Sequence, residues 1–564
     1  MKNRLNLKLI LLLTIVATAI FFRFYGLERH DVLTDEASIS FRSIGYLDFL
    51  ATPYQTTPLE WLNFKPWWFN LSFHDHPFLN FLIQHIFFKL FGVSTYTMRA
   101  LPALFGVLSV ILIYFLGKRI FNDKLGIAAS ALLAVNVHHI WISRLALQES
   151  AAIFFVLLSL LIFLKALENK KYFYWFGITA GAALLIKLHA VIIFPLVVSY
   201  LLIFRPPAWT WKQKEVYLSF LITAVVFSPY LLYNFLLYKT FGHFDYQLSY
   251  LFKQYVDKWQ IRPGRFEFPT LSSSLKYFFL NLKDNFSPLF LIGSGSGFVF
   301  LALALIKKKL GELKNKVAWV LTIIMLYFLL LLFIGPSQRF LSLIAPWLAI
   351  LLAFTALWLS QRRFKTTVVI LIFFLGFEAF FSYNTAISLE KRGIENLTYS
   401  KSKIHAFAYG YNSLEPFVAE VTRGKKPKVI LPINNNNLAK IVEENAKKQP
   451  GKPAAIMFIH DPRLYGESVL WILTRRMIYE GWPVLSYDVY KETLRNLGEN
   501  FFREMGITEF YYIAPTKNLP LQPNLIVTSS DEELRQFENK LRNRLTATLK
   551  NPFGQEVFRI YKFN

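Results

Sequence analysis

Long apolar runs separated by short polar or charged connections make up most of the first 384 residues. A helix needs about 20 mostly apolar residues to cross the hydrocarbon core of a bilayer. About eleven runs approach that length: residues 7–22, 95–117, 125–142, 150–167, 172–186, 190–204, 216–237, 286–306, 317–334, 341–359 and 367–383. The pattern predicts a polytopic α-helical membrane protein with about eleven transmembrane helices.

A shorter apolar segment, residues 78–91, follows a polar stretch, and we interpret it as an interfacial or re-entrant helix. After residue 384 the composition changes to that of a soluble domain. Short apolar runs predict buried strands, and longer amphipathic stretches predict helices. The strands are expected at residues 428–432, 454–459, 509–513 and 556–562, and the helices at 468–480 and 490–505.

Two domains are therefore expected. Residues 1–384 form a transmembrane core whose first outer loop, residues 23–76, carries the polar motifs described below. Residues 385–564 form a soluble α/β domain on the same side as that loop, and we expect them to be accessory to the chemistry.

Composition narrows the class of protein. Hydrophobic residues make up 54% of the chain and charged residues 17%, compared with about 25% charged residues in soluble globular proteins. The mean hydropathy is +0.36. Such a chain is neither a water-soluble enzyme nor a disordered polymer. With no cysteine, it has no disulfide, cysteine-ligated metal or thiol nucleophile.

The net charge of +26 fits either a nucleic-acid binder or a membrane protein with basic loops. The lysines and arginines gather in alternate connections, within residues 2–8, 118–124, 165–171, 205–214, 307–316 and 362–365. The short connections opposite hold little more than Arg144, Lys187 and Arg339. This asymmetry predicts a multi-pass protein of the cell membrane with a cytoplasmic N-terminus and an extracytoplasmic C-terminal domain. The expected partner is therefore the lipid bilayer. Because the loops account for much of the positive charge, the charge no longer supports a nucleic-acid partner.

The first run also resembles a signal peptide with a small-residue site at Ala17-Thr18-Ala19. Apolar residues continue past that site to Phe24, which favours a membrane anchor.

Asp35 and Glu36 lie in the first outer loop, soon after the first predicted span. Paired carboxylates near a bilayer face are suited to general-base chemistry when their surroundings tune them. The alternative is a solvated pair, or a Thr34-Asp35-Glu36 sequence that simply opens a helix.

The same loop ends at His74-Asp75-His76-Pro77. Two histidines and an aspartate are possible metal ligands. In an extended segment, however, His74 and His76 face one side and Asp75 the other. We therefore favour a role in positioning substrate, predict no cofactor, and keep a divalent metal at these three residues as the less favoured alternative.

Further polar residues stand at helix ends on the predicted outer face: Arg99, Arg144, Glu149, Lys187 and Arg339. The arginines and the lysine suit a lipid phosphate. The alternatives are that the cations snorkel to the interface and that Glu149 complements a helix dipole. Charged residues are nearly absent from the helix centres, with Glu378 as the main exception.

Together these motifs resemble the GT-C superfamily of membrane glycosyltransferases. The resemblance is strongest to the protein O-mannosyltransferases and the lipid A aminoarabinose transferase, and by order and topology it covers roughly residues 7–383. In chain order its motifs are Asp35-Glu36, His76-Pro77, Arg99-Ala100-Leu101-Pro102, Ser143-Arg144 through Glu149, and Arg339 followed by Pro346.

The resemblance implies a polyprenyl-phosphate-linked sugar donor that is used on the outer face. It implies that Asp35 is the catalytic base, with Glu36 completing the acidic motif. His76 matches a family position near the donor phosphate, although Phe78 replaces the second proline of that motif. Glu149 stands where many relatives have aspartate, and Arg339 corresponds to a basic residue near the lipid phosphate.

The residues fit this chemistry on their own terms as well. A lipid phosphate is a good leaving group that needs cations, for which we nominate Arg339, Lys187 and Arg99; the resemblance adds His76. One base suffices to take the proton of the acceptor hydroxyl, and we nominate Asp35, with Glu149 or Glu36 as second choices. A single displacement inverts the anomeric carbon. His74, Asp75 and Arg144 are expected to position substrate.

Two other classes of function remain. A transporter or flippase of lipid-linked sugars usually places ionisable groups near the membrane midplane, where this sequence has few. A membrane-anchored binding protein acting through its C-terminal domain has no need for Asp35 and Glu36. The acceptor class stays open among protein, glycolipid and envelope glycan.

Overall fold

A computed structural model describes residues 2–49, 57–62, 64–205, 213–254, 270–361, 364–401, 407–523 and 527–564. The chain divides into two compact units. The first, the helical unit, comprises Met1–Leu27, Ala51–Thr56 and Trp68–Ile404. The second, the sheet unit, comprises Glu28–Leu50, Thr57–Trp67 and His405–Asn564.

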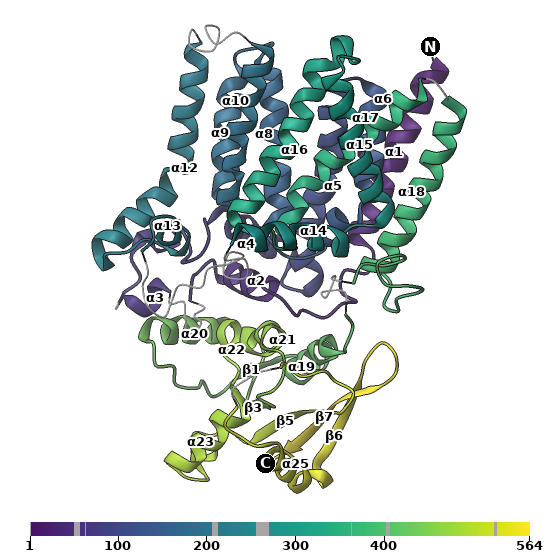
Figure 1. The fold of residues 1–564 in the computed structure, drawn as a ribbon. Helices are drawn as coiled ribbons and strands as arrows, with labels where there is room; N and C mark the ends of the chain where they lie inside the picture. The colour runs from purple at the N-terminus through teal and green to yellow at the C-terminus, as the bar shows by residue number, and fades with distance from the viewer. Residues whose placement is uncertain are drawn as a thin grey trace. The chain divides into compact units, whose positions relative to one another are not determined.

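Eight described stretches of helix are long and apolar enough to cross a membrane (Figure 1). They are α1 (Lys2–Phe24), α5 (Thr95–Ile120), α8 (Glu149–Ala166), α12 (Lys214–Phe241), α15 (Pro288–Ile306), α16 (Lys314–Ile334), α17 (Ala345–Ser360) with the preceding turn η4 (Phe340–Ile344), and α18 (Phe364–Ala386). Each coincides with a predicted span, which confirms a polytopic helical membrane fold.

The other three predicted spans are helical but shorter or bent. The run at 125–142 forms α6 (Asp123–Ala134) and α7 (Val137–Ser143), which meet at an angle of 63° and add a ninth crossing if they are one broken span. The bend falls at Asn136, whose side chain caps α7 by accepting a hydrogen bond from the His139 N–H. Helices α9 (Tyr172–Ile186) and α10 (Ile193–Phe204, preceded by η2, Leu188–Ile192) are too short to qualify by length.

Helix α9 nevertheless packs between two long spans, α8 and α12. Gly177 and Gly181, four residues apart, lie on its contact with α12. A Cβ atom on Gly177 would stand 2.5 Å from the Ser219 carbonyl oxygen, and one on Gly181 would stand 2.7 Å from Val226. Small residues at this spacing let two membrane helices approach closely, so α9 belongs to the bundle.

One end of the bundle collects the basic connections. Lys8 on α1 pairs with Asp123 at 2.9 Å, and Arg119 at the end of α5 donates to the Leu164 carbonyl on α8 at 2.9 Å. Asn315 on α16 donates to the Ile203 carbonyl on α10. We call this the basic end and define it by Lys8, Arg119, Lys165, Arg205 and Lys316. It is the end at which the N-terminus lies in Figure 1, so the structure brings together the loops that the charge pattern grouped.

The opposite end, here called the site end, holds the start of α8 and the ends of α1 and α9. The helices α4 (Leu79–Phe91), α13 (Tyr246–Leu251) and α14 (Leu271–Asn285) also lie there (Figure 1). Helix α4 covers nearly all of the short apolar segment predicted as a helix at residues 78–91.

The sheet unit contains a five-stranded sheet of order β4-β3-β5-β7-β6. Its strands are β3 (Ile456–His460), β4 (Val484–Ser486), β5 (Glu509–Pro515), β6 (Leu545–Lys550) and β7 (Glu556–Phe563). Strands β4, β3 and β5 are parallel, whereas β7 is antiparallel to both β5 and β6. A separate parallel pair joins β1 (Lys425–Pro427) to β2 (Lys452–Ala454).

Helices supply the remaining core of this unit. They are α19 (Leu414–Thr422), α20 (Asn436–Lys448), α21 (Gly466–Val469), α22 (Arg475–Glu480), α23 (Tyr487–Leu497), α24 (Phe501–Glu504) and α25 (Asp531–Lys540). Met457, Tyr490, Phe502 and Tyr512 belong to one buried cluster formed by the strands and these helices. The predicted α/β character is confirmed.

Three details of the prediction were wrong. The strand expected at 428–432 is β1 at Lys425–Pro427 instead, and the one expected at 454–459 is two strands interrupted at Ala455. The helix expected at 490–505 is broken by Gly498, whose φ of +105° is a conformation that glycine adopts at little cost. Strands β4 and β6 were not predicted, because β4 is short and β6 lacks buried positions.

Part of the first loop belongs to the sheet unit. Helix α2 (Glu36–Gly45) follows Asp31, whose carboxylate accepts hydrogen bonds from the N–H groups of Gly410 and Asn412, both at 2.9 Å. Tyr479 on α22 donates to the Phe41 carbonyl. The division by contacts thus groups residues 28–50 with the C-terminal part of the chain, whereas the sequence placed the whole loop in the transmembrane core.

Candidate active site

A buried carboxylate faces two cations at the site end of the helical unit. Glu149 Oε1 lies 2.6 Å from Lys187 Nζ and 4.0 Å from Arg339 Nε. The Glu149 side chain is 1% exposed, that of Lys187 12% and that of Arg339 30%. A charge buried this deeply is tolerated when it is paired. The cluster carries one negative and two positive charges, so it retains a net positive charge near its exposed side.

Each member of this cluster stands where a helix starts or stops. Glu149 is the first residue of α8, where a negative charge is favoured by the helix dipole. Lys187 has extended backbone angles (φ −161°, ψ 133°) and separates α9 from η2. Arg339 precedes η4, which leads into α17. Polar groups predicted at three separate helix ends are therefore brought together by the fold.

Aromatic side chains lie beside the lysine of the cluster, and buried polar atoms lie on neighbouring residues. Lys187 Nζ lies 5.0 Å from the centre of the Phe340 ring, a cation–π distance. The His189 ring packs against the same phenylalanine at 5.6 Å, and it lies within electrostatic reach of His76. Within the described residues, both polar side-chain atoms of Gln148 and the Nε2 of His189 are buried without a hydrogen-bond partner. Buried polar atoms normally bind protein, water or ligand, so this place is suited to a polar ligand.

The residues His74, Asp75 and His76 form a bend and are not extended as predicted. The Asp75 carboxylate consequently faces both rings, at 2.9 Å from His76 Nδ1 and 3.8 Å from His74 Nε2. The bend is held by the Tyr246 N–H, which donates to the His74 carbonyl at 2.7 Å. In the described part of the chain, no group of three or more His, Cys, Asp or Glu residues is arranged to hold a metal ion.

Arg99 and Arg144 contact the main chain at the end of α1. Arg99 donates to the Leu27 carbonyl at 2.7 Å. Arg144 donates to the carbonyls of Tyr25 at 2.9 Å and Gly26 at 3.1 Å, and its Nη1 also reaches Phe22. Cations are favoured where a helix exposes its last carbonyl groups. These two arginines therefore fix the point at which the first loop leaves the membrane helix.

The predicted base and its neighbour lie in the sheet unit. Asp35 occupies the N-cap position of α2 and is exposed, yet its side chain makes no capping hydrogen bond, whereas Glu36 is buried. The Thr34-Asp35-Glu36 sequence therefore does start a helix, which the sequence analysis gave as the alternative to a catalytic role. Burial raises the pKa of Glu467 on α21; a hydrogen bond from its own backbone N–H opposes the rise, and the charge of Asp35 adds a smaller increase.

Sequence reasoning missed Glu467, which is remote in the chain from Asp35 and belongs to no motif. It also missed Phe340, although the position next to Arg339 was a usable signal. A third omission is Asp245, a buried carboxylate that accepts hydrogen bonds from Tyr230 Oη and Asn234 Nδ2, each at 3.1 Å. Nothing in its local sequence distinguishes it from a loop residue.

Comparisons with known proteins agree with this architecture. Residues 75–233 match the family described as dolichyl-phosphate-mannose-protein mannosyltransferase. An uncharacterized protein of Aquifex aeolicus is 30% identical over 170 residues, which are 29% of this chain and 34% of that protein. The match thus spans about a third of the length of this relative.

Among solved structures, ArnT from Cupriavidus metallidurans bound to undecaprenyl phosphate aligns with a TM-score of 0.54 and 13% identity, covering 97% of both chains. Its apo state gives a TM-score of 0.52 at 12% identity, with the same coverage. The oligosaccharyltransferase of Archaeoglobus fulgidus gives 0.49 at 13% identity, over 90% of this chain and 69% of the other.

The chain is therefore a multi-pass membrane protein with the fold of the GT-C glycosyltransferases, and the resemblance found in the sequence is confirmed at the level of the fold. The matched family segment contains Glu149 and Lys187 of the buried cluster.

Proposed function

We propose that this protein is a membrane glycosyltransferase that moves a sugar from a polyprenyl-phosphate donor to an extracytoplasmic acceptor. The observation that carries the proposal is the cluster of Glu149, Lys187 and Arg339 at the site end of a helical unit with this fold. The binding of undecaprenyl phosphate by ArnT, which has the same fold, supports the choice of donor.

The two cations receive the donor phosphate. Arg339 is the more exposed of the two and presents a planar fork of N–H donors that matches phosphate oxygens. Lys187 acts as a point charge beside it, held at 2.6 Å by Glu149. As the sugar leaves, negative charge builds on the phosphate oxygens, and preorganised cations stabilise it without further rearrangement. Glu149 acts in this scheme as the anchor of the cations.

The acceptor supplies the nucleophile. Its hydroxyl oxygen forms a bond to the anomeric carbon while the bond from that carbon to the phosphate oxygen breaks, which inverts the configuration. The hydroxyl proton passes to a base, for which Asp35 is our assignment. The exposed position of Asp35 at the start of α2 and the family resemblance support this choice. Glu36 and Glu467 are the carboxylates to test next.

The other predicted residues take supporting roles. His76, whose Nδ1 lies 2.9 Å from the Asp75 carboxylate and which is electrostatically linked to His189, extends the donor site, and His74 faces the same carboxylate. Arg99 and Arg144 act indirectly, because their hydrogen bonds to main-chain carbonyls fix the end of α1. The proposal requires no cofactor.

The test is sugar transfer by the purified full chain, scored separately from donor binding, with a set of undecaprenyl-phosphate sugars. Asp35→Asn is expected to slow transfer by about 10²–10⁴-fold and leave donor binding within about twofold. Arg339→Ala is expected to weaken donor binding about tenfold as well as transfer. Glu28→Gln, an exposed carboxylate lost from the same loop, is the matched control and keeps parental activity.

Two results contradict the proposal. Transfer by Asp35→Asn at close to the parental rate places the base elsewhere, and Glu36 and Glu467 are then tested in its place. If the protein moves the donor across the bilayer of vesicles and transfers no sugar to any acceptor, it is a flippase and not a transferase.

A further inference from the structure

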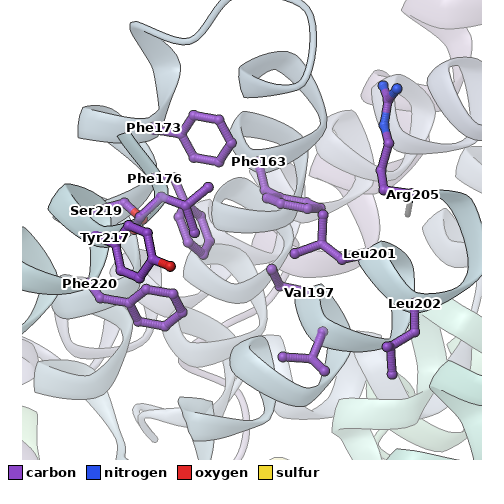
Figure 2. Close-up of a pocket in the computed structure, with 12 residues that line it drawn as sticks. Phe163, Phe173, Phe176, Val197, Leu201, Leu202, Arg205, Tyr217, Ser219 and Phe220 are labelled. Atoms are coloured by element: carbon purple, nitrogen blue, oxygen red, sulfur yellow. The ribbon is translucent and has the colours of Figure 1, made fainter. Parts of the chain in front are cut away.

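An apolar pocket of about 390 Å³ lies among α8, α9, α10 and α12, close to the basic end (Figure 2). Its volume is within the range of about 300–1,000 Å³ that small-molecule sites occupy. The rings of Phe163, Phe173, Phe176 and Phe220 line it, and Arg205 is its one charged lining residue. In Figure 2 Arg205 stands at the edge of the group, apart from the aromatic side chains.

Arg205 also lines a second, smaller pocket of about 150 Å³ with a different character. Arg119, Lys316 and Glu168 line this pocket as well, so three cations and one carboxylate surround it. Glu168 pairs with Arg119 at 2.7 Å but is 75% exposed, so water screens much of its charge. The pocket therefore keeps an excess of positive charge.

The two pockets meet at one residue and differ in chemistry, as the two parts of a phospholipid do. The larger pocket has an apolar lining and lies among membrane helices, where the surrounding lipid supplies acyl chains. The smaller is basic and lies where those helices end. Basic pockets between transmembrane helices bind anionic lipid headgroups, and a guanidinium binds phosphate oxygens through two N–H groups.

The proposed donor site is elsewhere. Glu149 begins α8 and Phe163 lies 14 residues further along it, which is about 21 Å at 1.5 Å per residue. Lys187 likewise ends α9, whereas Phe173 and Phe176 lie in its first turns. A polyprenyl phosphate bound at the Glu149 cluster has its phosphate at the site end, so that phosphate does not bind Arg205 at the other end of the helices.

We propose that the basic end of the helical unit carries a binding site for an anionic phospholipid, with one acyl chain in the apolar pocket and the phosphate held by Arg205, Lys316 and Arg119. The charge pattern predicts that this end faces the cytoplasm, so the lipid belongs to the cytoplasmic leaflet. The site stands independently of the sugar-transfer chemistry.

The experiment uses the purified full chain in nanodiscs made from equal parts of phosphatidylcholine and phosphatidylglycerol. One of the two lipids at a time carries a photoreactive group on its acyl chain, and mass spectrometry maps the cross-links. Cross-links from phosphatidylglycerol are expected on the segments that line the apolar pocket. The double variant Arg205→Ala/Lys316→Ala is expected to reduce their yield at least about tenfold.

Three further variants isolate the cause. Lys309→Ala removes a positive charge from the connection that also contains Lys316. Lys309 lines neither pocket, so this variant is expected to leave the cross-link yield unchanged. Arg205→Lys keeps the charge and is expected to retain the yield within about threefold, which separates loss of charge from loss of fold. Val197→Phe fills the apolar pocket and is expected to remove the cross-links while all the cations remain.

Three outcomes overturn the proposal. Phosphatidylcholine that cross-links as well as phosphatidylglycerol shows that the pocket recognises no charge. An unchanged yield in the double variant, with thermal stability and monodispersity like those of the parent, removes the cations from the site. A photoreactive undecaprenyl phosphate that displaces phosphatidylglycerol from these segments makes the pocket part of the donor's tail site.

Discussion

The two ends of the helical unit use charge in opposite ways. At the site end, Glu149 and Lys187 are almost fully enclosed and 2.6 Å apart. At the basic end, Arg119 and Glu168 are 2.7 Å apart, but their side chains are 25% and 75% exposed. The two distances are nearly equal, so geometry alone does not distinguish the pairs. Burial does, because a desolvated charge depends on its partner and an exposed one is stabilised by water.

This difference separates the charges that we propose act on the donor from the charges that predict the orientation of the chain. At the basic end, the excess of positive charge is the feature that predicts on which side of the membrane its loops lie. The site end keeps its charges at a considerable cost in desolvation, and polar groups kept inside a membrane protein at such a cost are typically functional. Three predictions test the contrast, in order of decreasing effect.

The largest effect is expected from Glu149→Gln. The substitution preserves size but removes the carboxylate charge that faces Lys187 and Arg339, and breaking a buried pair in this way typically costs about 3–5 kcal/mol of unfolding free energy. Denaturant unfolding of the detergent-solubilised chain measures the loss. The double variant Glu149→Gln/Lys187→Met also removes the buried positive charge of Lys187 and is expected to recover at least half of the lost stability. Parental stability in the single variant would show that the cluster is solvated.

Asp245, a buried carboxylate that accepts hydrogen bonds from the neutral groups of Tyr230 and Asn234, extends the comparison to the dependence of stability on pH. Burial raises the pKa of Asp245 to about 6, although hydrogen bonds from the Leu248 N–H, Asn234 and Tyr230 favour the carboxylate form. Because the pKa of Asp245 in the folded chain exceeds the ordinary aspartate value of 3.8, the contribution of Asp245 to stability is complete below about pH 4 and is lost as the pH rises through 6.

The expected loss is about 3 kcal/mol, which corresponds to roughly two pKa units. Unfolding of the parent and of Asp245→Asn is compared at pH 4 and pH 7. The variant keeps a neutral side chain at both values, so its stability relative to the parent should increase with pH over this interval. Parallel pH profiles for the two proteins would contradict the shifted pKa.

The smallest effect is expected from Glu168→Gln at the basic end. An exposed ion pair contributes about 0.2–1 kcal/mol and is screened by salt. The variant is therefore expected to unfold within about 1 kcal/mol of the parent at low ionic strength and to match it in concentrated salt. A loss comparable to that of Glu149→Gln would remove the distinction between the two ends.

Hydropathy predicted most of the helical unit because a membrane span depends on local composition. All eleven predicted runs are helical, but the sequence did not reveal the bend between α6 and α7. That bend depends on a single cap at Asn136, and asparagine also occurs in helices that continue. The strand expected at 428–432 failed for a related reason, because a short apolar run does not determine its own pairing partner.

The candidate site was predictable in composition but not in geometry. Charge at helix ends and the family resemblance identified Glu149, Lys187 and Arg339, yet only the fold shows that one carboxylate holds both cations. Arg99 and Arg144 were nominated on the same grounds, and their hydrogen bonds to carbonyls of α1 are invisible in sequence. Long-range packing also explains why Glu467 went unnoticed beside Asp35.

The place of α2 in the sheet unit has a consequence for synthesis of the protein. Residues 28–50 leave the ribosome early, but the C-terminal residues they contact begin at Phe407, whose carbonyl accepts from the Asp31 N–H, so nearly all of the helical unit is translated between the two. At about 5–20 residues per second, the segment that carries Asp35 waits some tens of seconds for its partners. A chain released early lacks Gly410 and Asn412, the two main-chain donors to Asp31. Nascent chains therefore reach the membrane before the predicted base is held in place, and only completed translation supplies its support.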